Sequence, residues 1–222
     1  MSKINMMQGD CMEHMASLPD NAYELAIVDP PYGINADKNQ NDLSGKKGFT
    51  KNAGTYKKYH LTNWDNNIPE KKYFDELKRV SKNQIIWGGN YFDILLTGII
   101  IWHKLGSGNF KEGELAKTSI NTFRLFSYSR ADAYINDCDV KIHPTQKPVA
   151  LYKWLLKNYA KPGDKILDTH GGSGSICIAC HDMGFDLDWI ELDHDYYKAA
   201  VDRFNTHTAQ GSLFEFEGGG IV

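Results

Sequence analysis

The sequence predicts an α/β fold with a doubly wound, mostly parallel sheet. In the C-terminal half, two short segments with apolar centres, Lys165–Asp168 and Asp188–Glu191, alternate with segments of helical periodicity. Strands that alternate with helices in this way form parallel sheets. A glycine-rich turn, Gly171–Gly174, follows the first segment, as in folds that bind ligands where a strand ends. The length of 222 residues fits one domain, residues 1–222.

The N-terminal half adds two helices and several strands. Asp10, with Glu13 three positions on, is typical of a helix start, and Pro19 ends this helix. Leu25–Val28 is a short apolar run before two prolines, which predicts a buried strand. A further helix begins near Pro69. Its apolar face comprises Tyr73, Phe74, Leu77 and Val80, and short strands are expected after it at Gln84–Trp87, Ile99–Trp102 and Phe123–Tyr128.

Three helices are expected in the C-terminal half. Apolar residues recur at helical spacing over Tyr152–Tyr159, and Pro162 follows as a stop signal. Helices are also expected over Ile176–His181, after the glycine turn, and over Tyr197–Phe204. We expect the chain after Gln210 to be loosely held, because it ends in three glycines.

Composition excludes several classes of protein. With 41% hydrophobic and 24% charged residues, the chain is of the globular rather than the disordered type. It has no apolar run near the ~20 residues of a membrane helix and no apolar stretch of the signal-peptide kind, so we expect no membrane partner. Four irregularly spaced cysteines favour a cytoplasmic protein. Cys177 and Cys180 have metal-ligand spacing but no second pair, so we expect buried thiols and no metal site.

Charge is distributed unevenly, although the net charge is only -3. Between Gly33 and Leu61 six lysines face two acids, a local excess of +4, whereas nine acids face two basic residues between Asp182 and Glu217. A basic segment on an acidic body can contact a polyanion at one face. A solvated polar loop is the alternative reading of the lysines.

The glycine turn indicates a ligand-binding strand end. A strand, a glycine turn and a helix N-terminus allow a ligand to approach the backbone closely. Glu191 ends the next predicted strand, 20 residues beyond Gly171, where α/β folds place a carboxylate that binds ribose hydroxyls. The spacing is not G-x-G-x-x-G, so a nucleoside ligand is favoured over a dinucleotide. A tight turn with a solvated Glu191 is the alternative.

Asp29-Pro30-Pro31-Tyr32 indicates a ligand-binding turn. It follows the buried strand Leu25–Val28 and so lies at the strand end where open α/β sheets keep their sites. Two prolines remove two N–H donors and leave carbonyls and a carboxylate as acceptors. Such acceptors suit a planar ring that carries an NH2 group, with the ring stacked on the tyrosine. The alternative is a rigid turn without chemistry.

Three motifs in this order resemble one enzyme family. Asp29–Tyr32, then His143–Pro148 and then the glycine turn are similar to the beta group of S-adenosylmethionine-dependent amino-methyltransferases, the N6-adenine and N4-cytosine DNA methylases. The likeness extends through Gln8–Cys11, Ile85–Phe92 and Trp189–Asp193. The resemblance implies a Rossmann-like methyltransferase fold with circularly permuted motif order, because the catalytic motif precedes the cofactor motif. It also implies S-adenosylmethionine as cofactor and DNA as partner, with homodimer formation as an option.

The resemblance assigns roles to particular residues. Asp10 would bind the cofactor's adenine amino group, Glu191 its ribose, and Asp168 with the following turn its amino-acid end. The implied catalytic residues are Asp29, Pro30, Pro31 and Tyr32. The implied cofactor-binding residues are Asp10, Asp29, Thr145, Lys147, Asp168, His170, Gly171, Gly172, Ser173, Gly174 and Glu191. Thr169-His170 departs from the Pro-Phe that many members carry.

The expected activity is methyl transfer to the N6 amine of adenine in DNA, with the base flipped out of the helix. Aspartate at position 29 resembles the adenine type, since cytosine enzymes more often carry serine there. An N4-cytosine DNA or RNA methyltransferase is the alternative within the class, and a non-catalytic DNA-binding relative lies outside it. A nucleotide-binding dehydrogenase is disfavoured because G-x-G-x-x-G is missing.

DNA contacts are expected in two segments outside the catalytic motifs. The basic loop 35–66 directly follows the catalytic turn, so we expect it to grip phosphates beside the target and to be mobile without DNA. Its proposed contacts are Lys46, Lys47, Lys57 and Lys58. Residues 103–142 form the other segment, a small candidate region for target recognition.

Overall fold

The computed structural model of this chain describes residues 2–34, 65–106, 111–129, 132 and 141–217. Side chains beyond residue 210 are not described. Most of the basic loop, with Lys46, Lys47, Lys57 and Lys58, lies outside the described residues.

The described strands form one sheet that confirms the predicted fold class. Their order is β1-β8-β7-β2-β3-β5-β4-β6, and all neighbours are parallel except β5, which is antiparallel to both β3 and β4. The strands are β1 (Ile4–Gln8), β2 (Tyr23–Val28), β3 (Ser81–Trp87), β4 (Gly98–His103), β5 (Gly113–Thr118), β6 (Phe123–Ser127), β7 (Lys165–Asp168) and β8 (Asp186–Glu191).

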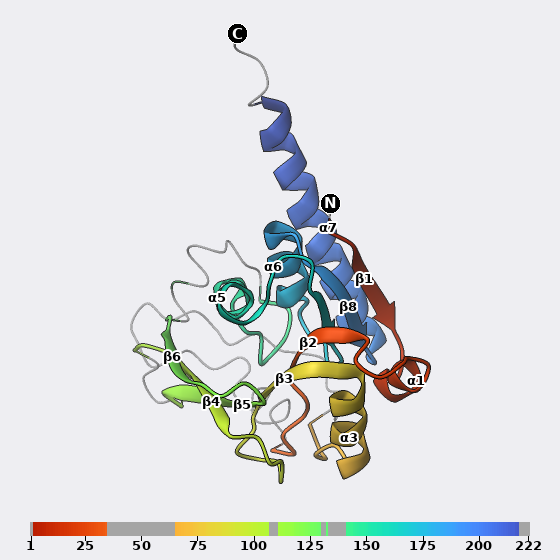
Figure 1. Cartoon of the computed structure of the whole chain (residues 1–222). Coiled ribbons are helices and arrows are strands. Elements are labelled where there is room, and N and C mark those ends of the chain that lie inside the picture. The colour runs from red at the N-terminus through yellow and green to blue at the C-terminus, as the bar shows by residue number, and fades with distance from the viewer. Residues whose placement is uncertain (1, 35–64, 107–110, 130–131, 133–140, 218–222) are drawn as a thin grey trace.

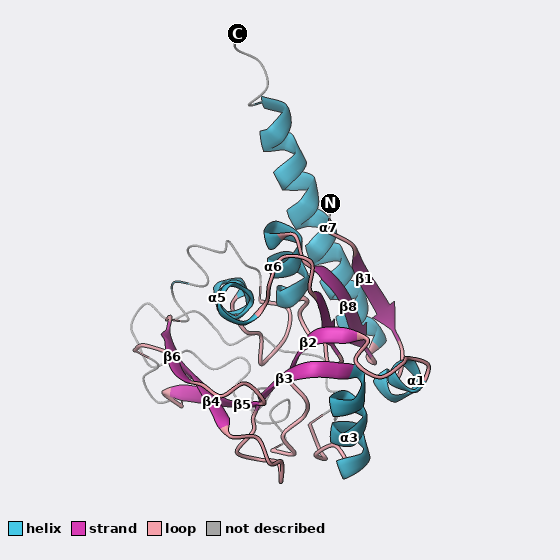
Figure 2. Ribbon diagram, viewed as in Figure 1, coloured by secondary structure: helices cyan, strands magenta, loops and turns pink. Residues whose placement is uncertain are grey.

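Helices cover both faces of this sheet (Figures 1 and 2). They are α1 (Cys11–Ala16), α3 (Lys71–Val80), α5 (Val149–Tyr159), α6 (Ser175–Met183) and α7 (His194–Glu217). Side chains of α1 and α3 pack on one face, and those of α5, α6 and α7 on the other. In the part of the chain that the structure describes, no helix is long and apolar enough to cross a bilayer.

Strand β2 separates two apolar cores because its side chains alternate between the faces. Leu25 and Ile27 pack in the core beneath α5 and α6, and Ala26 and Val28 pack in the core beneath α1 and α3. A strand buried on both faces reads as a continuous apolar run, which is why this element could be predicted.

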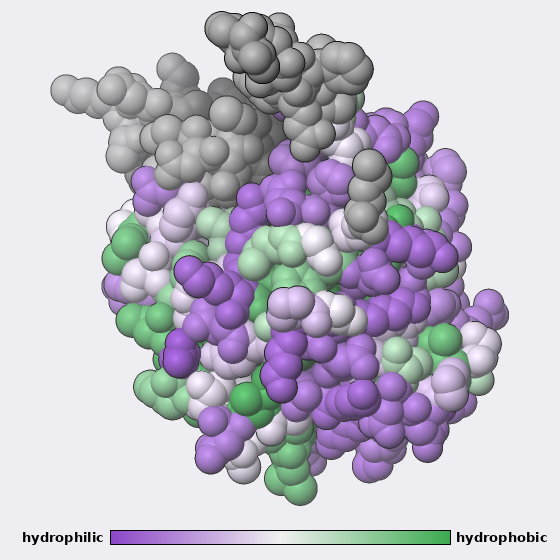
Figure 3. All heavy atoms as spheres, turned by 45° about the horizontal axis from the view of Figure 1, so that its top comes forward, coloured by the Kyte–Doolittle hydropathy of each residue, from purple (hydrophilic) through white to green (hydrophobic). Residues whose placement is uncertain are grey.

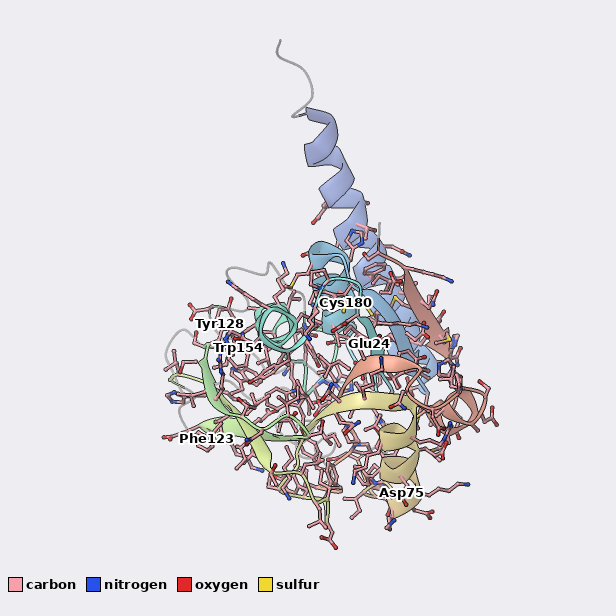
Figure 4. The ribbon with its side chains drawn as sticks, in the orientation of Figure 1. Glu24, Asp75, Phe123, Tyr128, Trp154 and Cys180 are labelled. Carbon is pink, nitrogen blue, oxygen red and sulfur yellow. The ribbon has the colours of Figure 1, made fainter. Side chains whose placement is uncertain are left out.

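Aromatic residues extend the first core toward β6. Phe126 contacts the ring of Trp154 at 5.3 Å between centroids and the ring of Tyr128 at 5.7 Å. Figure 4 shows Trp154 of α5 beside Tyr128, at the opposite end of β6 from Phe123. Trp87 and Trp102 are buried core residues. The thiols of Cys177 and Cys180 are buried, as predicted.

The structure adds elements that the sequence patterns did not predict. Strand β1 precedes the helix predicted at Asp10, and β5 lies inside residues 103–142. Because β5 pairs with β3 and β4, this part of the candidate recognition region belongs to the central sheet. Helix α7 continues to Glu217, beyond Gln210, where we expected a loosely held segment. Figure 1 shows the far end of α7 extending away from the body.

Candidate active site

A cavity of about 560 Å³ lies where parallel strands end. The carboxyl ends of β1, β8, β7, β2 and β3 meet at one edge of the sheet, which is where open α/β sheets bind ligands. The volume is within the range of small-molecule sites. The predicted site residues in its lining are Asp10, Asp29, Pro31, Thr145, Lys147, His170, Gly171, Gly172, Ser173 and Glu191.

Glu191 holds the glycine turn at one side of the cavity. Its carboxylate accepts hydrogen bonds from the N–H of Gly172 and the N–H of Asp193, both at 2.8 Å. Burial raises the pKa of Glu191, and these two backbone bonds oppose the shift. A carboxylate has about four lone-pair sites, so Glu191 retains acceptor capacity toward a ligand in the cavity.

Asp10 connects the start of α1 with the cavity wall. Its Oδ1 accepts the N–H of Met12 at 2.7 Å, which caps the helix as predicted. The N–H of Gly9 donates to the Glu191 carbonyl at 3.0 Å, so the loop after β1 is tied to the end of β8. The two acids predicted to contact a nucleoside therefore lie in one wall.

Asp168 is not part of the cavity lining. Its side chain is buried and accepts the N–H of His170 at 3.1 Å. Burial raises the pKa of Asp168 to about 8, and the nearby Asp29 and Glu191 add to this shift. Gly174 is also outside the lining and forms the N-terminal boundary of α6. Asp168 therefore holds the start of the turn through the His170 N–H, and Gly174 connects the end of the turn to α6.

His170 is fixed by hydroxyl groups. Its Nδ1 lies 3.0 Å from Thr169 Oγ1 and 3.4 Å from the Tyr73 hydroxyl, which itself bonds Thr169 at 2.7 Å. Burial lowers the pKa of His170 to about 4, so its ring is neutral at pH 7. The departure Thr169-His170 therefore brings a polar, uncharged ring into the cavity wall.

The His143–Pro148 motif contributes His143, Thr145, Gln146 and Lys147 to the cavity lining. The N–H of Thr145 donates to His143 Nδ1 at 3.4 Å, and the Thr145 hydroxyl lies 3.1 Å from the same atom. The His143 ring also contacts Tyr196 with centroids 4.4 Å apart. His143 is buried, which lowers its pKa to about 3. It orients Thr145 toward the cavity.

Asp29 of the catalytic turn also lies in this cavity. Its Oδ1 accepts the hydroxyl of Tyr32 and its Oδ2 accepts the ammonium of Lys147. Burial raises the pKa of Asp29, while the Lys147 charge opposes that rise. The predicted catalytic motif and the His143–Pro148 motif are thus joined by a buried ion pair.

The ring of Tyr32 is not part of the cavity lining in this structure. Its ring stacks on Tyr91 with centroids 4.9 Å apart and an interplanar angle of 11°. A Cβ at Gly88 would lie 2.1 Å from this ring, so only glycine allows the close approach. Pro30 is buried and, like Tyr32, is not part of the cavity lining. Stacking of a base on Tyr32 stays a prediction.

Asp65 holds the backbone of the catalytic turn. Its buried carboxylate accepts the N–H of Tyr32 at 2.6 Å and the N–H of Gly33 at 2.9 Å. The two ends of the basic loop therefore meet at the turn, and Asn67 and Ile68 continue into the cavity lining.

The acids in the lining outnumber the bases. Asp10, Asp29, Glu70 and Glu191 face Lys72 and Lys147, and the two buried histidines are neutral at pH 7. This charge balance favours a ligand with positive charge. A sulfonium compound with an ammonium group fits such a cavity, whereas a pyrophosphate does not.

Comparison with protein-family models identifies the chain. A DNA methylase model of the N6/N4 type matches residues 55–202, which is about two thirds of the chain. The chain belongs to the DNA methylase family. It is an S-adenosylmethionine-dependent DNA methyltransferase of the N6/N4 type, which confirms the predicted family and cofactor.

Two curated relatives match the methylase over most of its length. YubD of Escherichia coli (strain K12), which is named a methylase, is 25% identical over 221 residues, covering 89% of this chain and 88% of the relative. The type II methyltransferase M2.MboI of Moraxella bovis is 24% identical over 252 residues, covering 92% and 89%.

Solved structures share the fold of the methylase. The M1.HpyAVI–SAM complex has a TM-score of 0.58 at 18% identity, and the alignment covers 90% of this chain and 99% of that one. The cytosine-N4-specific PvuII DNA methyltransferase has a TM-score of 0.59 at 15% identity, with 94% and 91% covered.

Asp65 and Glu114 are among the site residues that were not predicted from the methylase sequence. Asp65 contacts the catalytic turn across the basic loop, and Glu114 of β5 contacts Lys147 at 3.1 Å. The only available signal was an acid inside a predicted polar or recognition segment, which is an ordinary surface feature. Among the described residues, no group of three or more metal-ligating side chains is present.

Proposed function

We propose that the methylase transfers a methyl group to the exocyclic N6 amine of adenine in DNA. The observation that carries this proposal is the position of Asp29 in the same cavity as Glu191 and the glycine turn. An amine inside a duplex cannot reach such a cavity, so the target base must leave the stack.

Asp29 is proposed to bind the target amine. The lone pair of an exocyclic amine is delocalised into the ring, and a hydrogen bond from the amine to a carboxylate favours a pyramidal, more nucleophilic nitrogen. The Lys147 ammonium favours ionised Asp29, which then acts only as an acceptor. The Pro30 carbonyl is the second proposed acceptor.

The cofactor site is proposed to be the wall that holds Asp10, Glu191 and the glycine turn. When bound, S-adenosylmethionine supplies an electrophilic methyl group. Glu191 keeps acceptor capacity for ribose hydroxyls, and Asp10 lies beside it for an amino group. Asp168 is proposed to act mainly from behind, by holding the N–H of His170.

Tyr32 is proposed to stack on the flipped base after a rearrangement. Its hydroxyl binds Asp29 and one face of its ring lies on Tyr91. The ring must therefore turn from Tyr91 toward the cavity before a base can stack on it. The same turn would release the Asp29 oxygen that the hydroxyl occupies.

Aspartate at position 29 supports adenine as the target, by resemblance to the adenine type. We expect mass spectrometry of nucleosides, from DNA treated with the protein and labelled S-adenosylmethionine, to show N6-methyladenine. Asp29→Asn removes the ionised acceptor, so the rate should fall at least about 100-fold. Asp75→Asn is the matched control, because Asp75 pairs with Lys71 on the exposed side of α3 (Figure 4).

Each other outcome argues against a particular part of the proposal. N4-methylcytosine would overturn adenine as target, and labelled RNA without labelled DNA would overturn DNA as substrate. If no nucleoside is labelled, the chain is a non-catalytic relative. An Asp29→Asn protein with the parental rate would remove Asp29 from the reaction.

A further inference from the structure

Four buried or half-buried charged side chains form a continuous network of ion pairs that ends at Asp29. Lys147 Nζ contacts Asp29 on one side and Glu114 Oε2, at 3.1 Å, on the other. The second oxygen of Glu114 binds the ammonium of Lys104. The signs alternate from Asp29 to Lys104, and the four groups together are neutral.

The four residues come from separate elements. Asp29 follows β2, Lys104 follows β4, Glu114 belongs to β5 and Lys147 precedes α5. Only Asp29 and Lys147 line the cavity. The side chains of Lys147 and Lys104 are 1% and 4% exposed, so neither ammonium is solvated by bulk water.

The indole rings of Trp87 and Trp102 favour the charged form of the two lysines. Lys147 Nζ lies 5.3 Å from the ring centroid of Trp87, and Lys104 Nζ lies 4.7 Å from that of Trp102. Both distances are within the range of cation–π attraction. Burial alone would raise the pKa of Glu114, but the two lysines outweigh it and hold this pKa at about 2. The Lys147 pKa is raised by its two acids against the effect of burial.

A contribution to the stability of the fold does not account for a buried ion-pair network of this kind. Buried ion pairs often contribute no more than apolar residues of similar volume would. In this network the Lys147 ammonium is shared between two carboxylates, those of Asp29 and Glu114. With Glu114 as a second partner, Lys147 neutralises Asp29 only in part, so Asp29 keeps more of its capacity to accept a hydrogen bond from the cavity side.

We propose that Glu114, held by Lys104, is a positioning residue for methyl transfer, which orients Lys147 and so sets the charge that Asp29 presents to the target amine. The inference rests on the proposed function, because it requires Asp29 to bind that amine. Among the described residues, the titratable groups that act on Asp29 or are acted on by it are Lys147, Glu114, Tyr32, Asp168, Tyr73 and Tyr152.

The central test is Glu114→Gln in the full chain, assayed by nucleoside mass spectrometry from pH 5 to 9. We expect kcat to fall roughly 10- to 100-fold, with the KM for S-adenosylmethionine within about twofold of the parent. The negative charge of Glu114 raises the pKa of Asp29. Because Glu114→Gln removes that charge, the pKa of Asp29 should fall, and the fall of kcat on the acid side of the pH profile, the acid limb, should move to lower pH. Glu114→Asp keeps the charge and should keep the parental limb.

A double variant separates positioning from stability. Glu114→Gln removes the Glu114 carboxylate from the buried Lys104 ammonium, which should lower the melting temperature. Lys104→Met in the same chain removes that charge and should restore much of the melting temperature. It should not restore kcat, because Lys147 still lacks its second carboxylate. Asp75→Asn, at the exposed Lys71–Asp75 pair, is the matched control and should change neither quantity.

Two results would overturn the inference while the proposed function stands. One is a parental kcat and acid limb in Glu114→Gln, and the other is recovery of kcat in the double variant together with its melting temperature. If instead the parent protein methylates no nucleoside, the proposed function fails first and the inference fails with it.

Discussion

At the scale of single residues, burial and partners decide which acids of the site are charged. Glu114 has two lysine partners and its pKa is about 2. Asp168 is equally buried but accepts one backbone N–H and lies near other acids, and its pKa is about 8. The same chemical group is therefore ionised at Glu114 and largely protonated at neutral pH at Asp168.

Asp168→Asn should stabilise the protein at alkaline pH. The unfolded Asp168 ionises near pH 4, whereas burial raises its pKa in the folded state to about 8. Between these values the folded state binds more protons, so the contribution of Asp168 to stability is lost as pH rises from about 4 to about 8. Asparagine keeps an acceptor for the His170 N–H and does not titrate.

Thermal unfolding of the parent and Asp168→Asn at pH 5 and pH 8.5 measures this effect. The advantage of the variant should be larger at pH 8.5, and a domain of this size gains roughly 2–4 °C per kcal/mol. Asp164→Asn, at the residue just before β7, is the control. An equal advantage at both pH values would show that Asp168 is ionised in the folded protein.

At the scale of elements, the glycine turn is set by the strand beside it. The N–H of Gly171 donates to the Ile190 carbonyl at 2.9 Å. A Cβ at position 171 would lie 1.9 Å from a ring atom of Trp189, whose indole is fully buried in β8. The turn can therefore lie against β8 only if residue 171 has no side chain.

Gly171→Ala should displace the turn and weaken cofactor binding by about tenfold or more, because Trp189 has no room to move. Isothermal titration with S-adenosylmethionine measures the loss. Trp189→Phe removes much of the clashing ring and breaks no hydrogen bond seen among the described residues, where the indole N–H has no partner. The double variant should bind more tightly than Gly171→Ala alone, and purely additive losses would argue against the contact.

Elements were predictable where their own sequence carried the signal. Strand β2 is apolar because both its faces are covered. Strand β5 carries Glu114 and Lys117, which read as surface residues, yet Glu114 is paired with buried lysines and the Lys117 ammonium donates to the Ile94 carbonyl at 3.1 Å. Strand β1 lies at a sheet edge and is only half-buried, so no apolar run marks it.

The site residues, like the strands and helices, were predictable only where a local sequence motif marks them. Asp29, Glu191 and the glycine turn sit at strand ends within recognisable motifs, and they do share one cavity. Asp65 and Glu114 act through partners more than thirty residues away, Tyr32 and Lys147. A contact of that sequence separation depends on the folded topology, and no local pattern contains it.

At the scale of the whole molecule, the fold places the ends of the basic loop beside the cavity. Asp65 binds Tyr32 and Gly33, so both ends of the lysine-rich segment meet at the catalytic turn. Figure 3 shows a mainly hydrophilic face with small, separate apolar areas. The body is acidic overall, so the loop lysines are the proposed source of phosphate contacts near the target base.

Replacing Lys46, Lys47, Lys57 and Lys58 together by glutamine should weaken DNA binding and reduce its salt dependence. Each phosphate contact contributes about 0.9 to the slope of log K against log[salt], so four contacts would lower the slope by up to about 3.6. Titrations of one duplex between 50 and 300 mM salt give this slope for the parent and the variant.

The matched control replaces four exposed lysines with glutamine at or near the opposite edge of the sheet, Lys3, Lys82, Lys157 and Lys161. It changes the net charge by the same amount, so it corrects for the long-range field of the protein. We expect the control to keep a slope within about one unit of the parent. Equal reductions in the two variants would mean that total charge, rather than contact by the loop, governs binding to DNA.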